Sequence, residues 1–451
     1  MFLLRKYQEV LAISTSIILY FFIGYDLDRA NFPQLIFLYL TLFIPFFFFM
    51  KRLKNNIPLL VALSILFRLT FLLAIPNLSQ DFYRFIWDGR MILEGLNPYI
   101  SLPETFIKTD NFPINQASEL YLGMGQLNGS HYTNYPPINQ LNFCIAAILA
   151  KSSILGSVII LRFQIILADI GIIYYGKKLL EKLQLPIHHI FLYALNPFII
   201  IELTGNLHFE SVMIFFLIWS LYLFLDKKWV WAAVIFGLSV SVKLIPLLFL
   251  PLFYQWFARE KKGKGILKLI CFGAIIMIMN SILFFPFFSS DLIGNYISSV
   301  GLWFQNFEFN ASIYYIAREI GYLCRGWNEI AIIGKIIPIV VFVFLLIISF
   351  FRKNKSPQQL ITALLIVLSF YYFSATTVHP WYIATLVLLC VFTKYRYPIV
   401  WSIVIILSYQ AYTNNPWEEN LYLVMLEYSI VYGFLIWELF LLKRNPLLIK
   451  Q

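Results

Sequence analysis

The sequence of this chain predicts an all-α protein that crosses a membrane many times. Of its 451 residues, 60% are hydrophobic and 13% are charged, whereas soluble domains are about 45–50% apolar and about 25% charged. The apolar residues form many runs near the roughly 20 residues that a helix needs to cross the hydrocarbon core. Most lysines and arginines stand in short segments between these runs, which is typical of membrane proteins with basic cytoplasmic segments.

These basic clusters set the expected topology. All of them fall on one side if that side is the cytoplasm. They lie at Arg5-Lys6, Lys51–Lys54, Lys177-Lys178, Lys227-Lys228, Lys261–Lys264, Arg352–Lys355, Lys394–Arg396 and Lys443-Arg444. The net charge of +11 therefore reflects topology, and we expect no nucleic-acid partner. The four cysteines show neither metal-binding nor disulfide spacing.

The same orientation predicts about 13 or 14 spans in order. The first apolar run is too long for a cleavable signal and is followed by Asp26–Arg29, so we expect a signal anchor. The run 138–150 is short, and we interpret it as re-entrant or membrane-surface. The run 229–258 contains Lys243 and Pro246, which predicts two short halves. The other predicted helices are 8–24, 33–50, 57–76, 154–176, 187–203, 210–225, 265–287, 329–350, 358–376, 380–393, 397–412 and 421–442. Outer segments are expected at 77–135 and 288–328.

The stretch from Asp81 to Tyr99 gathers charged and polar residues beside the membrane. Ser79 is a suitable helix cap, and Gly95 followed by Asn97-Pro98 is a typical stop. The predicted helix carries an apolar stripe of Phe82, Phe85, Ile86, Ile92 and Leu93. We therefore expect it to lie on the outer leaflet with this stripe in the lipid.

Three charged residues of this helix share one face. Asp81, Arg84 and Asp88 are spaced i, i+3 and i+7. A carboxylate at a lipid boundary can take a proton from a hydroxyl, and an adjacent arginine can neutralise a lipid-linked phosphate. The alternative is an amphipathic helix whose three charges form only a structural salt-bridge string.

The stretch resembles the first large outer loop of the GT-C glycosyltransferases, which use polyprenyl-phosphate sugars. It is similar to bacterial polyprenol-phosphate-mannose-dependent mannosyltransferases, whose loop reads Asp-x-x-Arg-aromatic-x-Trp-Asp-Gly and ends in Gly-x-Asn-Pro-Tyr. The order of the motifs also resembles the catalytic subunit of GPI mannosyltransferase I. The later motifs are Tyr135–Pro137, Asn196-Pro197, Gly205–Glu210, Lys243–Pro246, Ser312–Tyr314 and His379–Tyr382.

The likeness covers roughly 57–400 and implies a GT-C catalytic core there. Residues 1–56 would be an added N-terminal helix pair, and 401–451 would be C-terminal transmembrane helices. The resemblance implies that Asp81 is the base and that Asp88 positions it, although which of the two takes the proton stays open. The Asp-x-Asp form of eukaryotic relatives is absent, since Phe82 and Tyr83 follow Asp81. We therefore expect no metal and no other cofactor.

Further roles follow from the resemblance, each with a structural alternative. Arg84, Arg90, His208 and Lys243 would bind the donor phosphate, with His208 donating to it. His208 could instead be a structural hydrogen-bonder, and Lys243 could snorkel or pair with an acid. The aromatics of 379–382 could be an interface belt. Asp169, Glu202 and Arg68 are expected to pair structurally. The wall of the sugar, acceptor or prenyl pocket would comprise Trp87, Asn97, Tyr99, Tyr135, Asn206, Glu210, His379, Trp381 and Tyr382.

The resulting hypothesis is an inverting transferase that moves a hexose, with mannose the expected sugar, from a polyprenyl-phosphate donor to an acceptor hydroxyl. The active site would face the periplasm from a bacterial inner membrane. The acceptor, whether glycan, lipid or protein, and any partner subunit stay undetermined. Alternatives are a lipid-linked sugar flippase, a non-catalytic scaffold, and a GT-C-like polymerase or ligase that uses lipid-diphosphate glycans.

Overall fold

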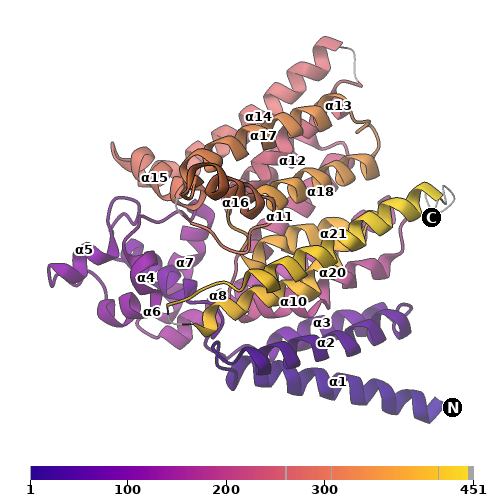
Figure 1. Cartoon of the computed structure of the whole chain (residues 1–451), viewed down its shortest axis with the longest axis horizontal. Coiled ribbons are helices and arrows are strands. Elements are labelled where there is room, and N and C mark those ends of the chain that lie inside the picture. Colours follow the sequence, from indigo (N-terminus) through magenta and orange to yellow (C-terminus); the bar gives the residue numbers. More distant parts are fainter. Residues whose placement is uncertain (1, 260–261, 306, 415, 445–451) are drawn as a thin grey trace.

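The computed structural model describes residues 2–444 apart from 260–261, 306 and 415. Long helices lie side by side, and a cluster of short helices sits at one end (Figure 1). In this described part, strand pairing is limited to an isolated bridge between Phe309 and Thr377. The all-α fold class is therefore confirmed.

The N-terminal half begins with two long helices and then forms the short-helix cluster. Its elements are α1 (Phe2–Tyr25), α2 (Phe32–Arg52), α3 (Ile57–Leu69), α4 (Asp81–Leu93), α5 (Pro103–Lys108), α6 (Ala117–Gly129), α7 (Pro137–Ala150), α8 (Ile154–Lys182), η1 (Ile187–Ile190), α9 (Phe191–Ala194), α10 (Pro197–Ile199), η2 (Ile200–Gly205) and α11 (Glu210–Leu225). The remaining elements are α12 (Trp229–Val240), η3 (Ile245–Phe253), α13 (Tyr254–Phe257), α14 (Lys262–Phe284), η4 (Phe285–Phe287), α15 (Leu292–Gln305), α16 (Ile313–Arg325), α17 (Ile330–Phe350), α18 (Pro357–Ser374), η5 (Pro380–Ile383), α19 (Ala384–Val391), α20 (Tyr397–Val404), η6 (Ile405–Thr413) and α21 (Leu421–Arg444).

Seven helices in the described residues are long and apolar enough to cross a membrane, and an eighth crossing exists if the pair bent by 50° at 187–205 is one span. The seven are Lys6–Tyr25, Phe32–Arg52, Ile154–Lys182, Gly263–Phe287, Ile330–Phe350, Pro357–Ser374 and Leu421–Leu441. The other predicted spans are shorter or are broken into two helices. Several of these helices begin at a proline, which has no N–H donor and is therefore tolerated in the first turn. The protein is thus a polytopic membrane protein, while the count of 13 or 14 crossings stays a prediction.

The predicted break within 229–258 is confirmed. Helix α12 ends at Val240, and η3 begins at Ile245. The intervening residues place Lys243 on the wall of a cavity. The break therefore frees a cationic side chain from the interior of a continuous apolar helix.

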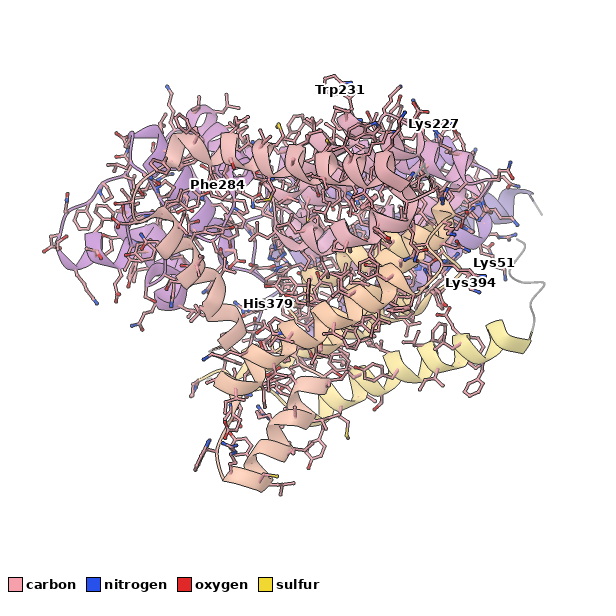
Figure 2. The ribbon with its side chains drawn as sticks, turned by 90° about the horizontal axis from the view of Figure 1, so that it is seen from above. Lys51, Lys227, Trp231, Phe284, His379 and Lys394 are labelled. Atoms are coloured by element: carbon pink, nitrogen blue, oxygen red, sulfur yellow. The ribbon has the colours of Figure 1, made fainter. Side chains whose placement is uncertain are left out.

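Three of the basic clusters lie toward one end of the molecule. Lys51, Lys227 and Lys394 come from three separate basic clusters and lie toward the same end (Figure 2). Phe284 and His379 lie toward the opposite side, with the short helices α4–α6 beyond them. This segregation is what the positive-inside bias produces.

The expectation that the apolar stripe of α4 lies in the lipid is wrong for most of the helix. Three of its five residues, Phe82, Phe85 and Ile86, are at most 2% exposed because α6 and α7 cover them. Near the end of the helix, Leu93 is 48% exposed. Phe85 stacks on Phe143 of α7 with ring centroids 4.6 Å apart. The apolar face is therefore a protein core, and this core fixes the position of the charged residues on the same helix.

Gly89 lets α4 cross α7 at very short range. A Cβ atom at this position would lie 2.2 Å from the backbone oxygen of Phe143, which cannot rotate away. We expect Gly89→Ala to lower the free energy of unfolding by about 1–3 kcal/mol through overpacking. A melting curve in detergent measures this. Gly294→Ala is the matched control, since no atom lies within 4 Å of its added methyl group; equal melting of the two variants would contradict the prediction.

Candidate functional site

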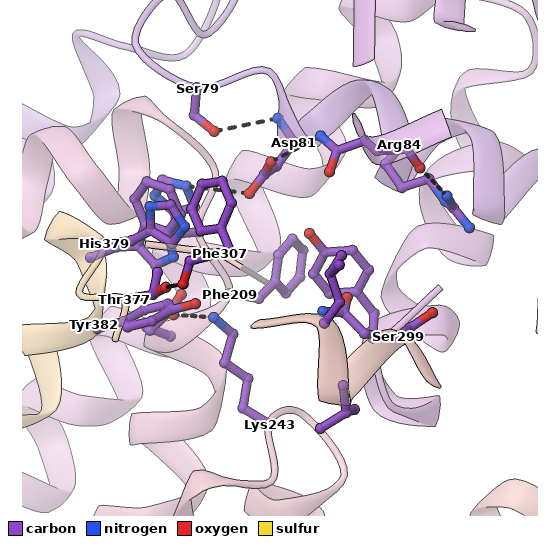
Figure 3. A pocket seen from close by; sticks show the side chains of 18 of the residues that line it. Ser79, Asp81, Arg84, Phe209, Lys243, Ser299, Phe307, Thr377, His379 and Tyr382 are labelled. Carbon is purple, nitrogen blue, oxygen red and sulfur yellow. Dashed lines mark hydrogen bonds and ion pairs between the residues drawn. The ribbon is translucent and has the colours of Figure 1, made fainter. Parts of the chain in front are cut away.

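A cavity of about 760 Å³ lies between the short-helix cluster and the bundle. Side chains from distant parts of the chain project into it, with Asp81 and Lys243 on opposite sides (Figure 3). Nine of the predicted site residues line it: Asp81, Arg84, Tyr135, His208, Glu210, Lys243, His379, Trp381 and Tyr382. The structure therefore brings together motifs that are far apart in the sequence.

Asp81 is the first residue of α4 and lies at the edge of the cavity. The prediction that Ser79 caps this helix is wrong, because the N-cap residue is Gln80 and makes no side-chain cap bond; the Ser79 hydroxyl only accepts the Asp81 backbone N–H at 3.3 Å. Asn128 donates to the Asp81 carboxylate at 3.5 Å, and 23% of the side chain is exposed. Burial raises the pKa of Asp81 above its usual 3.8, and the positive charge of Lys243 opposes this shift. An accessible carboxylate with a raised pKa is suited to accept a proton.

Asp88 and Arg84 hold each other in place. The Arg84 Nε atom donates to Asp88 at 2.8 Å, and Gln140 donates to the second Asp88 oxygen at 3.0 Å. Asp88 is fully buried and is not among the residues that line the cavity. The geometry therefore disfavours Asp88 as the base and agrees with a positioning role.

Arg84 lines the cavity, but its guanidinium is engaged within the protein. Besides Asp88, it donates to the backbone oxygens of Asn128 at 2.6 Å and of His131 at 2.9 Å. The predicted salt-bridge string is thus only half formed, since Arg84 pairs with Asp88 and not with Asp81. Arg84 thus holds the loop that carries Asn128 in place. Because these bonds occupy its guanidinium, Arg84 is poorly placed to bind a phosphate.

Six predicted residues lie outside the cavity lining. Arg90 donates to the Asn115 backbone oxygen at 2.7 Å, and Trp87 is buried next to Phe106. Such contacts hold the loop together and do not face a ligand. The six residues are Asp88, Arg90, Trp87, Asn97, Tyr99 and Asn206. Asn97 bonds to Phe287, Tyr99 to Tyr135, and Asn206 to Glu202.

His208 has a defined tautomer. Its Nδ1 atom lies 2.8 Å from the Glu202 backbone oxygen, and a carbonyl can only accept, so Nδ1 carries the proton. Burial lowers the pKa of His208 well below its usual 6.5. The neutral ring then has only a lone pair at Nε2, which lies 3.9 Å from the Asp81 carboxylate. The expectation that His208 donates to a phosphate therefore fails for the neutral ring, because Nε2 has no proton to give.

Trp381 is stacked between two imidazoles. Its ring centroid is 3.7 Å from that of His208 and 4.6 Å from that of His379. Burial lowers the pKa of His379 to about 3, so this ring is neutral as well. The stack holds the His208 ring in plane beside Asp81 and forms one wall of the cavity. These residues thus face the cavity instead of forming a lipid-interface belt.

Lys243 pairs with Glu210 in a close ion pair. Its Nζ atom also lies 5.3 Å from the ring centroid of Tyr382. The side chain is 26% exposed and lines the cavity. Lys243 therefore pairs with an acid, as the structural alternative predicted, and it is also accessible from the cavity.

The buried charges of the bundle pair as predicted. Arg68 on α3 and Asp169 on α8 form an ion pair of 2.7 Å with 1% of each side chain exposed. Glu202 accepts from the Tyr409 hydroxyl at 2.8 Å. These groups are structural partners, and neither Arg68 nor Asp169 lines the cavity.

Sequence reasoning missed Arg29 and Tyr412. Arg29, in the turn between α1 and α2, lines the cavity with its guanidinium carbon 3.4 Å from the ring centroid of Tyr412. One signal was available: in the predicted topology Arg29 falls on the outer side, against the positive-inside bias. The 1–56 helix pair therefore contributes to the cavity instead of being only an addition to the core.

Residues 35–259 match a family model described as alpha-(1->6)-mannopyranosyltransferase, N-terminal domain. This range includes Asp81, His208, Glu210 and Lys243. The chain is therefore a relative of the GT-C mannosyltransferases. It is 26% identical over 209 residues to alpha-(1->6)-mannopyranosyltransferase A of Corynebacterium glutamicum. That match covers 42% of this chain and 39% of the relative, so the chain spans well under two thirds of the relative's length.

Proposed function

We propose that the protein transfers mannose from a polyprenyl-phosphate donor to an acceptor hydroxyl, with inversion, at the outer face of a bacterial inner membrane. One observation carries the proposal: the Asp81 carboxylate opens onto a cavity of about 760 Å³ within the stretch that matches the mannosyltransferase family. This volume lies in the usual range for a small-molecule site. The acceptor can be a glycan, a lipid or a protein side chain.

In the proposed reaction, Asp81 takes the proton of the acceptor hydroxyl as its oxygen attacks the anomeric carbon. The bond between this carbon and the donor phosphate oxygen breaks, and its electron pair leaves with polyprenyl phosphate. The new glycosidic bond has inverted configuration because attack and departure are in line. His208 lies beside Asp81, with its Nε2 atom 3.9 Å from the carboxylate, and its stack on Trp381 helps to shape the wall that orients the incoming group.

The charge balance of the cavity supports a single proton acceptor. Lys243 is compensated by Glu210, and Arg84 is compensated by Asp88. Asp81 has no ion pair with a lysine or an arginine within 4.0 Å in the described residues. Its carboxylate is thus free to bind a proton without breaking a salt bridge.

The outer-face location rests on charge segregation. Lys51, Lys227 and Lys394, from three of the basic clusters, lie toward the end away from α4–α6 (Figure 2), and basic segments face the cytoplasm in most membrane proteins. A flippase remains the alternative of another class, and a ligase that uses lipid-diphosphate glycans remains the alternative among enzymes.

The test uses purified protein in lipid nanodiscs with polyprenyl-phosphate mannose and a membrane glycan extract. We expect mannosylated product from the monophosphate donor and none from the diphosphate donor. The expected absence of a metal requirement predicts that a chelator leaves the rate unchanged. Product from the diphosphate donor alone would favour the ligase. Movement of intact donor across vesicles without product would favour the flippase.

A further inference from the structure

The turn that carries Arg29 is fixed next to the start of the catalytic loop. The Asn77 amide donates to the backbone oxygens of Ile23 at 2.8 Å and of Leu27 at 2.7 Å. These bonds tie the end of α1 to the segment that leads into α4. Arg29 is therefore held at the cavity by the fold, although it precedes the stretch that matches the family model.

The two acidic residues next to Arg29 in the sequence are occupied elsewhere. Asp26 accepts from the Gln34 amide at 3.2 Å, and Asp28 accepts from the Ala30 backbone at 2.9 Å. No ion pair within 4.0 Å joins Arg29 to a carboxylate in the described residues. Its Nε atom is buried and has no hydrogen-bond partner there.

Arg29 differs in this respect from the other arginine and the lysine of the cavity. Arg84 is paired with Asp88, and Lys243 is paired with Glu210. The charge of Arg29 lies over the Tyr412 ring at 3.4 Å, which holds the guanidinium without neutralising it. Arg29 is therefore the cavity cation without an ion pair within 4.0 Å in the described residues, and its charge acts at longer range on Asp81 and Glu202.

We propose that Arg29 is an anion-binding residue of the cavity and holds the phosphate of a lipid-linked phosphodiester. The inference rests on the proposed function and names the part of the substrate that this residue binds. A guanidinium suits a phosphate because its planar donors can bind two oxygens at once. Because Arg29 lines the cavity, its guanidinium is within reach of a ligand there.

The chemistry gives Arg29 a larger role in the transition state than in the bound donor. The donor phosphate carries one negative charge as a diester, and it gains a second as the bond to the sugar breaks. A cation already in place stabilises that added charge without moving. Interactions that strengthen in the transition state raise the rate of the chemical step.

The experiment compares Arg29→Gln and Arg29→Lys with wild type in nanodiscs. We expect Arg29→Gln to lower kcat/KM for polyprenyl-phosphate mannose by about 10- to 100-fold, the effect of losing a charged hydrogen bond. Arg29→Lys keeps the charge but loses the planar set of donors, so we expect an intermediate loss of kcat/KM. Arg325→Gln is the matched control, since this exposed arginine pairs with Glu329 outside the cavity.

Equilibrium binding of polyprenyl phosphate separates this inference from the proposed function. We expect Arg29→Gln to weaken binding relative to wild type and Arg325→Gln to leave it unchanged. Competition by inorganic phosphate, or by phosphatidylglycerol in place of phosphatidylcholine, shows whether the subsite takes any phosphate or requires the prenyl chain. Wild-type transfer with unchanged binding and kcat/KM in Arg29→Gln would overturn the inference alone. Binding that depends on Arg29 without mannosyl transfer would support the subsite and overturn the proposed function.

Discussion

Asp81→Asn is expected to reduce mannosyl transfer by about 10²- to 10⁴-fold, the usual contribution of a positioned general base. The amide keeps the shape of the side chain but cannot accept the hydroxyl proton. Since burial raises the pKa of Asp81 above 3.8, wild-type kcat/KM should rise with pH as this group loses its proton. The pH profile and the rate of Asp81→Asn are measured in the same nanodisc assay.

Asp88→Asn is the comparison that separates a base from a positioning residue. Asp88 is buried against Arg84 and Gln140, so its loss should lower the melting temperature along with activity. Asp81→Asn should melt like wild type, because its side chain borders the cavity. An active Asp81→Asn enzyme beside a stable but inactive Asp88→Asn enzyme would reverse the two assignments.

Breaking the ion pair between Arg68 and Asp169 should cost more stability than any other single change considered for this protein. Both side chains are 1% exposed, and their atoms lie 2.7 Å apart. Asp169→Leu leaves the Arg68 charge buried without its partner, and we expect a loss of about 3–5 kcal/mol in the free energy of unfolding. Arg68→Met should cost a similar amount for the converse reason.

The double variant Arg68→Met with Asp169→Leu is the control for this prediction. Removing both charges leaves none unpaired, so stability should recover in large part. Some loss should remain because Ser211 and Tyr193 also donate to Asp169, at 3.0 and 3.3 Å. Additive losses in the double variant, measured by denaturation in detergent, would show that the pair does not act as a unit.

Local signals predicted the end of α4 well. Gly95 follows the end of α4 with a φ of 74°, a conformation that glycine adopts at low cost, whereas the N-cap is Gln80 and not the predicted Ser79. The break at Lys243 was also predictable, because a lysine and a proline interrupt an apolar run. Each of these features depends on neighbours close in the sequence.

Features that depend on distant contacts were not predictable in the same way. The apolar stripe of α4 showed that the helix has a buried face, but only the packing of α6 and α7 shows that protein, not lipid, covers it. Trp87 and Tyr99 share a motif with Asp81, yet they stabilise the loop from behind the cavity. Arg29 carries no motif at all and reaches the cavity through the fold of the N-terminal turn.

The cavity wall is assembled from segments spread along almost the whole chain, from Arg29 to Trp417. A ribosome produces these segments in order, so Asp81 enters the membrane long before His379 and Tyr412 are translated. The site therefore stays incomplete through most of synthesis and insertion. A partly made chain holds Asp81, the proposed base, but lacks the aromatic wall of the cavity, so the proposed catalysis would begin only when membrane assembly is complete.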